Sequence, residues 1–173
     1  AGHAANPAAE LEAPAVDVVG TTPLPGVGTP TSKVPANVQT ATDRQIEALP
    51  SPALPDFLER SMGGFVSSTS QGNPFQPDVS FRGFTASPLI GTPQGMSVYV
   101  DGVRVNEPFG DVVNWDLIPK NAISSVTLIP GSNQVFGLNT LGGALAVITK
   151  SGSTYPGVAA QAYGGSFGRW AIE

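Results

Sequence analysis

The stretch that decides the fold is MSVYVDGVRV, residues 96–105. Apolar and polar side chains alternate along residues 96–100, as they do in a β-strand with one buried face. Asp101-Gly102 then supplies the two positive-φ positions of a type I′ turn. Residues 103–105 return as a second strand. The stretch therefore predicts a β-hairpin.

Three further segments predict strands on either side of this hairpin. Residues 123–129 (ISSVTLI) are rich in the β-branched side chains that favour extended backbone. Residues 143–149 (GALAVIT) are almost continuously apolar, which is typical of a strand covered on both faces. Upstream, residues 78–84 (DVSFRGF) form another strand candidate.

Two short helices are predicted before these strands. Residues 34–40 could form a short strand, and Thr42 with Gln45 then makes a capping-box signal for a first helix. Residues 55–60 predict a second helix, with Pro55 in its first turn. The Gly-, Ser- and Gln-rich residues 61–77 predict a loop.

The two ends of the chain differ from this middle part. Residues 1–33 are rich in Ala, Pro, Gly and Thr and predict a disordered arm. Within the arm, residues 16–22 (VDVVGTT) are β-prone and favour an extended backbone. Residues 153–173 alternate small or aromatic apolar side chains with polar ones, a pattern typical of a transmembrane barrel strand. A single such strand needs neighbours, so we expect the rest of a barrel outside this chain.

Composition excludes several classes of function. The 8 Lys and Arg form no basic stripe and the net charge is −5, so we do not expect nucleic-acid binding. The chain has no cysteine and its one histidine is His3, in the arm, which excludes thiolate metal sites and histidine-based catalytic sites. No phosphate-binding loop motif is present. Four acidic residues raise the possibility of a calcium site, namely Asp101, Glu107, Asp111 and Asp116, but Asp101 is better explained by its turn and the other three match no EF-hand spacing. We therefore expect no enzyme, no cofactor and no resident metal.

Three segments, in this order and spacing, resemble the plug domain of TonB-dependent outer-membrane receptors. Residues 79–84 (VSFRGF) are similar to the family's Ile-Arg-Gly-Phe strand, and residues 97–103 (SVYVDGV) to its Asp-Gly hairpin. Residues 123–150 are similar to its closing signature, in which Gly142-Gly143 leads into a final strand. The segment 164–168 (GGSFG) resembles the start of the first barrel strand.

The resemblance implies an α+β fold with a small mixed four-stranded sheet, short helices and long loops. It divides the chain into a periplasmic arm (1–33), a plug domain (34–152) and a linker with the first barrel strand (153–173). The plug would gate the pore of its own β-barrel in the outer membrane, for energised uptake of a scarce small molecule such as a ferric siderophore.

The resemblance also assigns two sets of contact residues. The C-terminal domain of TonB would bind the arm at Val16, Asp17, Val18, Val19, Gly20 and Thr21. Strand addition to the edge of a partner's sheet suits such a segment. A ligand, such as a metal chelate, would meet the loops at 70–76, 84–94 and 106–115. The candidate contacts are Gln71, Asn73, Phe75, Thr85, Ser87, Asn106, Glu107, Phe109 and Asp111. For Trp115 we expect a packing role.

Arg82 is the candidate latch to the barrel wall, because a buried strand arginine needs a carboxylate partner and the family places that partner on the barrel. A solvated edge arginine is the alternative. A second arginine that the family often has before the Gly of its third segment is absent, since Ile129-Pro130 precedes Gly131.

Two other functions stay open from sequence. A periplasmic binding or signalling module could reuse a plug-like fold without transport. A secreted adhesive β-domain, which would bind no TonB, is the third interpretation. A receptor differs from both in the sequence expected beyond residue 173, because it would continue with many alternating strands.

Overall fold

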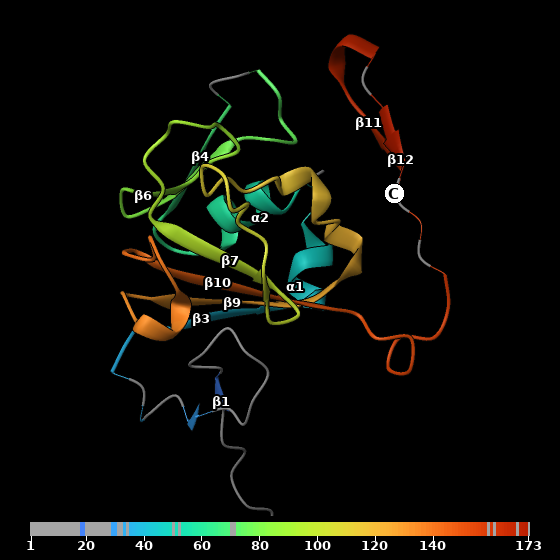
Figure 1. Ribbon diagram of the computed structural model, residues 1–173. Helices are drawn as coiled ribbons and strands as arrows, with labels where there is room; N and C mark the ends of the chain where they lie inside the picture. The colour runs from blue at the N-terminus through green and yellow to red at the C-terminus, as the bar shows by residue number, and fades with distance from the viewer. Residues whose placement is uncertain are drawn as a thin grey trace, which may run out of the picture.

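The computed structural model describes residues 18–19, 29–30, 33, 35–49, 51, 53–69, 72–158, 160, 162–168 and 170–172. Figure 1 shows a folded middle part with the chain entering and leaving at its sides. Within these residues, helices, strands and short 3₁₀ turns come in the order β1 (Val18–Val19), β2 (Thr29–Pro30), β3 (Gln39–Thr42), α1 (Asp43–Ala48), α2 (Leu54–Ser61), β4 (Phe65–Ser68), β5 (Asp78–Phe81), β6 (Phe84–Ala86), β7 (Met96–Val100), β8 (Val103–Arg104), η2 (Trp115–Leu117), η3 (Lys120–Ala122), β9 (Ile123–Pro130), η4 (Gln134–Phe136), β10 (Gly143–Thr149), β11 (Ala162–Gly164), η5 (Ser166–Gly168) and β12 (Trp170–Ile172).

The main sheet is mixed, in the order β3-β9-β10-β7-β8. Strand β10 pairs antiparallel with β9 and parallel with β7. The α+β class and the mixed sheet are confirmed, but the sheet has five strands where four were expected. The predicted return of the hairpin forms one edge of this sheet, since Tyr99 and Val100 of β7 pair with Arg104 and Val103 of β8. Asp101 and Gly102 have φ values of 50° and 82°, as the predicted turn requires.

Strand β10 is covered on both faces, as its continuous apolar sequence predicted. Leu145 and Val147 belong to the larger core cluster, together with the buried side chains of both helices. Ala144 points the other way, into a smaller cluster with Tyr99 and Phe136. The side-chain alternation of a strand thus serves two separate cores.

Both helices form where the sequence predicted them. The Thr42 backbone N–H donates to Gln45 Oε1 at 3.0 Å, which is the backbone half of the capping box before α1. Helix α2 has Pro55 in its first turn and buries Phe57 and Leu58 completely. Burying two such side chains contributes about 3–6 kcal/mol of hydrophobic free energy, which fixes α2 on the sheet.

A second, three-stranded sheet, β4-β5-β6, was not predicted. The prediction of a continuous loop over residues 61–77 is wrong at β4, which pairs antiparallel with β5. Pairing brings the buried rings of Phe65 and Phe81 together, with centroids 5.1 Å apart. Tertiary contact therefore decides the conformation of β4, because its own composition is that of a loop.

The predicted strand at residues 78–84 is in fact a hairpin. Strand β5 ends at Phe81, and Arg82 and Gly83 turn the chain with φ values of 49° and 89°. Strand β6 then runs back along β5.

Two boundary predictions also differ. The strand expected at residues 34–40 begins at Gln39, and Val34 lies outside the described residues. Residues near the C-terminus form two short antiparallel strands, β11 and β12, joined through η5, instead of one continuous strand. Among the described residues, no helix has the length and apolarity needed to cross a bilayer.

The Arg-Gly-Phe segment and the closing Gly-Gly segment are in direct contact. Phe84 lies over Gly142, where an added Cβ would be 2.4 Å from Phe84 Cβ and 2.6 Å from Cγ. Gly95 holds Gly142 in this position, since the Gly95 carbonyl accepts the backbone N–H groups of Leu141 at 3.0 Å and Gly142 at 2.8 Å. Only a residue without a side chain at position 142 leaves room for the phenylalanine.

Candidate functional site

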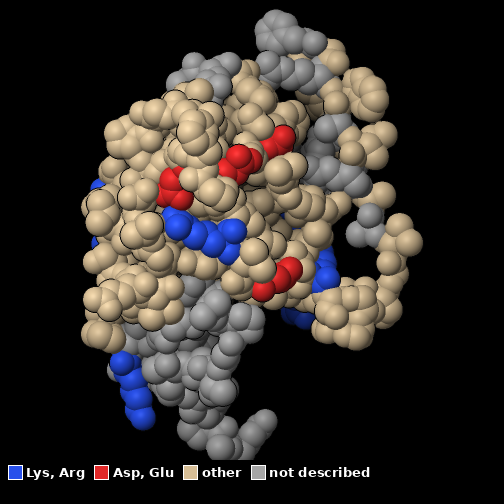
Figure 2. Space-filling view, in the orientation of Figure 1, with Lys and Arg blue, Asp and Glu red and all other residues tan. Residues whose placement is uncertain are grey.

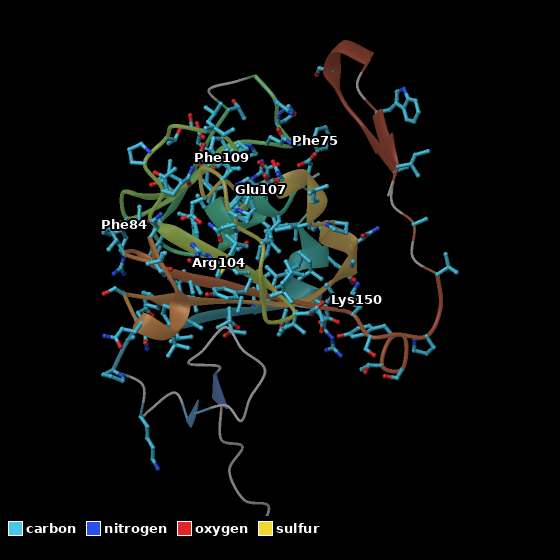
Figure 3. All side chains as sticks on the ribbon, in the orientation of Figure 1. Phe75, Phe84, Arg104, Glu107, Phe109 and Lys150 are labelled. Atoms are coloured by element: carbon cyan, nitrogen blue, oxygen red, sulfur yellow. The ribbon has the colours of Figure 1, made fainter. Side chains whose placement is uncertain are left out.

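The three loops predicted to meet a ligand converge at one end of the molecule. The Val113 N–H donates to the Ser87 carbonyl at 3.0 Å, which joins the second loop to the third. Gln76 Nε2 donates to Asp116 Oδ1 at 2.8 Å, which joins the first loop to the end of the third. Figure 3 shows side chains from the first and third of these loops at this end. We call it the three-loop surface, defined by residues 72–76, 87–94 and 106–116.

Trp115 is buried in the larger core cluster and anchors the third loop of this surface. Its indole Nε1–H donates to the Ala86 carbonyl at 3.1 Å, so the ring ties the third loop to the end of β6. The predicted packing role of Trp115 is confirmed.

Two predicted contact residues are buried and hold the loops together. The Ser87 side chain bonds to Asp78, and its Oγ accepts the Leu89 N–H. The side-chain amide of Asn106 donates to the Met96 carbonyl at 3.0 Å. The physical reason is that irregular backbone leaves polar groups unpaired, and short polar side chains satisfy them. We therefore exclude Ser87 and Asn106 from the contact surface.

Other predicted contact residues are at the surface. Phe109 is 76 % exposed and Phe75 is 37 % exposed, and Asn73 is exposed too. Glu107 is exposed, and its Oε1 accepts the Asn114 side-chain amide at 2.6 Å. These four side chains are accessible to another molecule.

Two residues of the predicted set lie elsewhere. Thr85 lies within strand β6, half-buried and paired with Ser80, and not on a loop. Gln71 lies outside the described residues.

An ion pair that the sequence reasoning missed anchors the third loop. Arg104 Nη2 lies 2.8 Å from Asp111 Oδ1, with side-chain exposures of 27 % and 15 %. The same Nη2 donates to the Leu138 carbonyl at 2.8 Å. Asp111 has a φ of 55°, an unusual backbone region for a residue other than glycine. Arg104 therefore holds a strained loop residue and a distant loop together, and the predicted ligand contact Asp111 has a structural partner. The sequence signal that could have revealed this ion pair is Arg104 itself, two residues after Gly102 of the hairpin turn.

The other acidic residues considered for calcium bind different partners. Asp101 Oδ1 accepts the Thr149 N–H at 2.8 Å and Oδ2 accepts its hydroxyl at 2.7 Å, which ties the hairpin turn to β10. Asp116 binds Gln76. Within the part of the chain that the structure describes, no three His, Cys, Asp or Glu residues group together as a metal site would need.

Arg82 is exposed, and its guanidinium carbon lies 5.0 Å from the centroid of the Phe81 ring. The predicted placement of Arg82 within a strand is wrong, because the residue occupies the β5–β6 turn. From there the guanidinium can reach a partner outside this chain.

The arm is described only in part. Val18 and Val19 form β1 and pair antiparallel with Pro30 and Thr29 of β2. The other candidate TonB contacts lie outside the described residues, namely Val16, Asp17, Gly20 and Thr21. The β-prone segment therefore has extended backbone at its two valines.

The linker that leaves β10 is fastened to helix α1. Lys150 Nζ lies 2.5 Å from Glu47 Oε1, and the Tyr155 hydroxyl donates to Asp43 Oδ2 at 2.9 Å. The hydrogen bond from Tyr155 is the main reason that the pKa of the Asp43 carboxyl is lowered from its usual value of 3.8. The linker thus lies against the first helix of the domain, beside an open hollow of about 420 Å³ lined in part by Lys150, Tyr155 and Val158.

Comparison with known proteins agrees with this architecture. Residues 30–144 match the family described as TonB-dependent Receptor Plug Domain. The chain is 28 % identical over 133 residues to the "Vitamin B12 transporter BtuB" of Vibrio cholerae, a match that covers 76 % of this chain and 20 % of the transporter. The chain thus spans about a fifth of the length of that relative.

Solved structures give the same result. A double mutant of the Serratia marcescens hemophore receptor HasR, in complex with its hemophore HasA and heme, aligns with a TM-score of 0.53 and 27 % identity, covering 69 % of this chain and 17 % of HasR. A structure of the FpvAI–pyocin S2 complex aligns with a TM-score of 0.52 over 72 % of this chain and 15 % of that chain, at 14 % identity, which shows the fold alone. The family match spans well over half of the chain, and this chain therefore belongs to the plug domains of TonB-dependent receptors.

Proposed function

We propose that this chain is the gate of an outer-membrane receptor that takes up a scarce small molecule with energy supplied through TonB. Family membership supports a gate, since plug domains belong to receptors of this kind. The relatives are a transporter and receptors, and we propose no enzymatic activity for this chain.

The observation that carries the proposal is the separation of two sides of the domain. The three loops meet on one surface through the bonds of Val113 and Gln76. The arm enters the domain through β3, which forms the opposite, lower edge of the sheet in Figure 1. A ligand on the loops and a partner on the arm can then bind at the same time without competing.

The arm would bind the C-terminal domain of TonB by strand addition at residues 16–21. Val18 and Val19 already have extended backbone, so little further ordering is needed when a strand forms. Main-chain hydrogen bonds would carry the pull on the domain. The pull would reach β3, which has only one neighbouring strand, before any other strand of the main sheet.

The remaining contacts concern the barrel and the ligand. We propose that residues 153–173 lead from the plug into a surrounding barrel, and that the exposed Arg82 pairs with a carboxylate on the barrel wall. Side chains of the three-loop surface would contact the ligand, namely Asn73, Phe75, Glu107 and Phe109, with Asp111 positioned by Arg104.

The experiment is a binding measurement between this chain and the purified C-terminal domain of TonB. A variant lacking residues 16–22 is compared with one lacking residues 5–11, a deletion of equal length elsewhere in the arm. We expect the first deletion to abolish binding and the second to leave it unchanged. Absence of binding by the intact chain would contradict the proposal and favour a periplasmic binding or signalling module.

A further inference from the structure

The three-loop surface has an unusual charge composition. Residues 72–76, 87–94 and 106–116 contain no Lys, Arg or His and three acidic residues, Glu107, Asp111 and Asp116. On the face seen in Figure 2, the blue basic groups lie at mid-height and below, and none lies over the loops at the top. The loops therefore offer no cation to a negatively charged ligand.

The three acidic residues are not equivalent. Arg104 neutralises Asp111 in a partly buried ion pair. Glu107 accepts a hydrogen bond from the uncharged amide of Asn114, so its negative charge persists at the surface. Asp116, which accepts from the uncharged amide of Gln76, adds a second exposed negative charge at the edge of the surface. Glu107 and Asp116 together give the surface a negative potential, since the fields of exposed like charges add over several ångströms.

Apolar side chains provide the rest of the accessible surface. Phe109 is exposed, and Ile90 is 64 % exposed. Ile90 lies against Gly110, where an added Cβ would be 3.5 Å from both of its γ carbons, so Ile90 and the third loop share one patch. Exposed aromatic and aliphatic groups of this kind stabilise a complex by removing apolar area from water.

We infer that this surface selects a ligand that is uncharged or positively charged and presents an apolar face, and that it disfavours polyanionic chelates. The inference rests on the proposed function, because it specifies the ligand class of the same surface. Phe109 and Ile90 supply the apolar contact, and Glu107 sets the charge preference.

The experiment uses one chelate in three charge states. The gallium(III) complex of a linear trihydroxamate with a free terminal amine is cationic; acetylation of the amine makes it uncharged, and succinylation makes it anionic. Gallium(III) is diamagnetic, so amide NMR signals of this chain report binding directly. We expect affinity to fall in the order amine, acetyl, succinyl, with about a fivefold difference between the first and the last for one carboxylate roughly 8 Å away in water.

Two variants separate the charge effect from the apolar effect. Glu107→Gln retains an acceptor for Asn114 and should reduce the difference between the cationic and anionic probes at least twofold. Phe109→Ala removes an exposed ring without opening the core, and should weaken all three probes by a similar factor. Chemical shift changes should be centred on Ile90, Glu107 and Phe109.

Three outcomes would overturn the inference: equal or tighter binding of the succinylated probe, a preference unaffected by Glu107→Gln, or no binding of any probe. The TonB experiment does not involve these loops. A chain that binds TonB but fails here keeps its proposed transport role and loses only the ligand class.

Discussion

The contact between Phe84 and Gly142 allows a quantitative test of the packing. Gly142→Ala would place a methyl group 2.4 Å from Phe84 Cβ, 2.6 Å from Cγ and 2.7 Å from Cδ2. The shortest of these contacts is with Phe84 Cβ, and a change of side-chain rotamer does not move Cβ, so it cannot relieve the clash. Backbone movement is restrained too, because Gly142 donates to Gly95 at 2.8 Å and accepts from Gly131 at 2.9 Å.

The expected loss of stability is worked from these distances. Overpacking of this kind costs about 1–3 kcal/mol. The φ of Gly142 lies outside the left-handed region, so alanine has no backbone penalty there and lowers the entropy of the unfolded chain by the equivalent of about 0.4–1 kcal/mol. We expect a net destabilisation of about 1–2 kcal/mol.

Urea unfolding monitored by tryptophan fluorescence measures this change. Trp115 is buried and will report loss of the core, while Trp170 is exposed and is replaced by Phe to remove its background. Gly152→Ala is the matched control, since an added Cβ there meets no atom within 4 Å. The control should remain within about 0.5 kcal/mol of the parent chain.

A double-mutant cycle gives the decisive result. Phe84→Gly removes Cβ, Cγ and Cδ2, the three atoms that the new methyl group would meet, so Gly142→Ala should cost at least about 1 kcal/mol less in that background. Additive effects of the two substitutions, or a Gly142→Ala chain as stable as its parent, would refute the packing argument.

Two other predictions concern the ion pair and the linker. Arg104→Gln should lower the unfolding free energy in the same urea assay by about 1–2 kcal/mol, because it leaves the partly buried Asp111 carboxylate unpaired; Arg82→Gln, at an exposed site, should change it by less than about 0.5 kcal/mol, and equal effects would count against the anchoring role. The Tyr155 bond to Asp43 lowers the pKa of that carboxyl, so its stabilising effect is complete above the usual pKa of 3.8 and is lost as the pH falls through the lowered value. Tyr155→Phe should therefore raise the pKa of Asp43 in an NMR titration, and an unchanged pKa would show that the hydroxyl does not bind it.

The parts of the fold that sequence predicted are those with local signals. The hairpin has its Asp101-Gly102 turn, α1 has its capping residues, and β10 has seven residues that are nearly all apolar. Strand β4 has no such signal, because FVSS lies among Gly, Ser and Thr and becomes a strand only beside β5. Arg82 was placed within a strand because residues 79–84 resemble the family's Ile-Arg-Gly-Phe strand, and only the positive φ at Arg82 shows the turn.

The candidate site was predicted at the level of loops and less well at the level of side chains. Sequence places polar residues on loops but does not tell which of them bind the loop's own backbone. Ser87 and Asn106 do so and are buried, whereas Glu107 stays exposed. The Arg104–Asp111 pair was also missed, since the two residues meet only because the loop folds back along β8.

The position of β10 in the main sheet determines when the domain can fold. Its two neighbours, β9 and β7, do not pair with each other. A growing chain that ends before residue 143 can therefore form two separate pieces, β3 with β9 and β7 with β8, each with an open edge. The sheet closes only when its last strand arrives, and this strand makes the parallel pairing between segments 47 residues apart, Met96 with Gly143. Closure through a contact between segments far apart in the sequence is slower than formation of a local hairpin. Until then the two pieces keep open strand edges, which are the parts of the domain most able to pair with another chain.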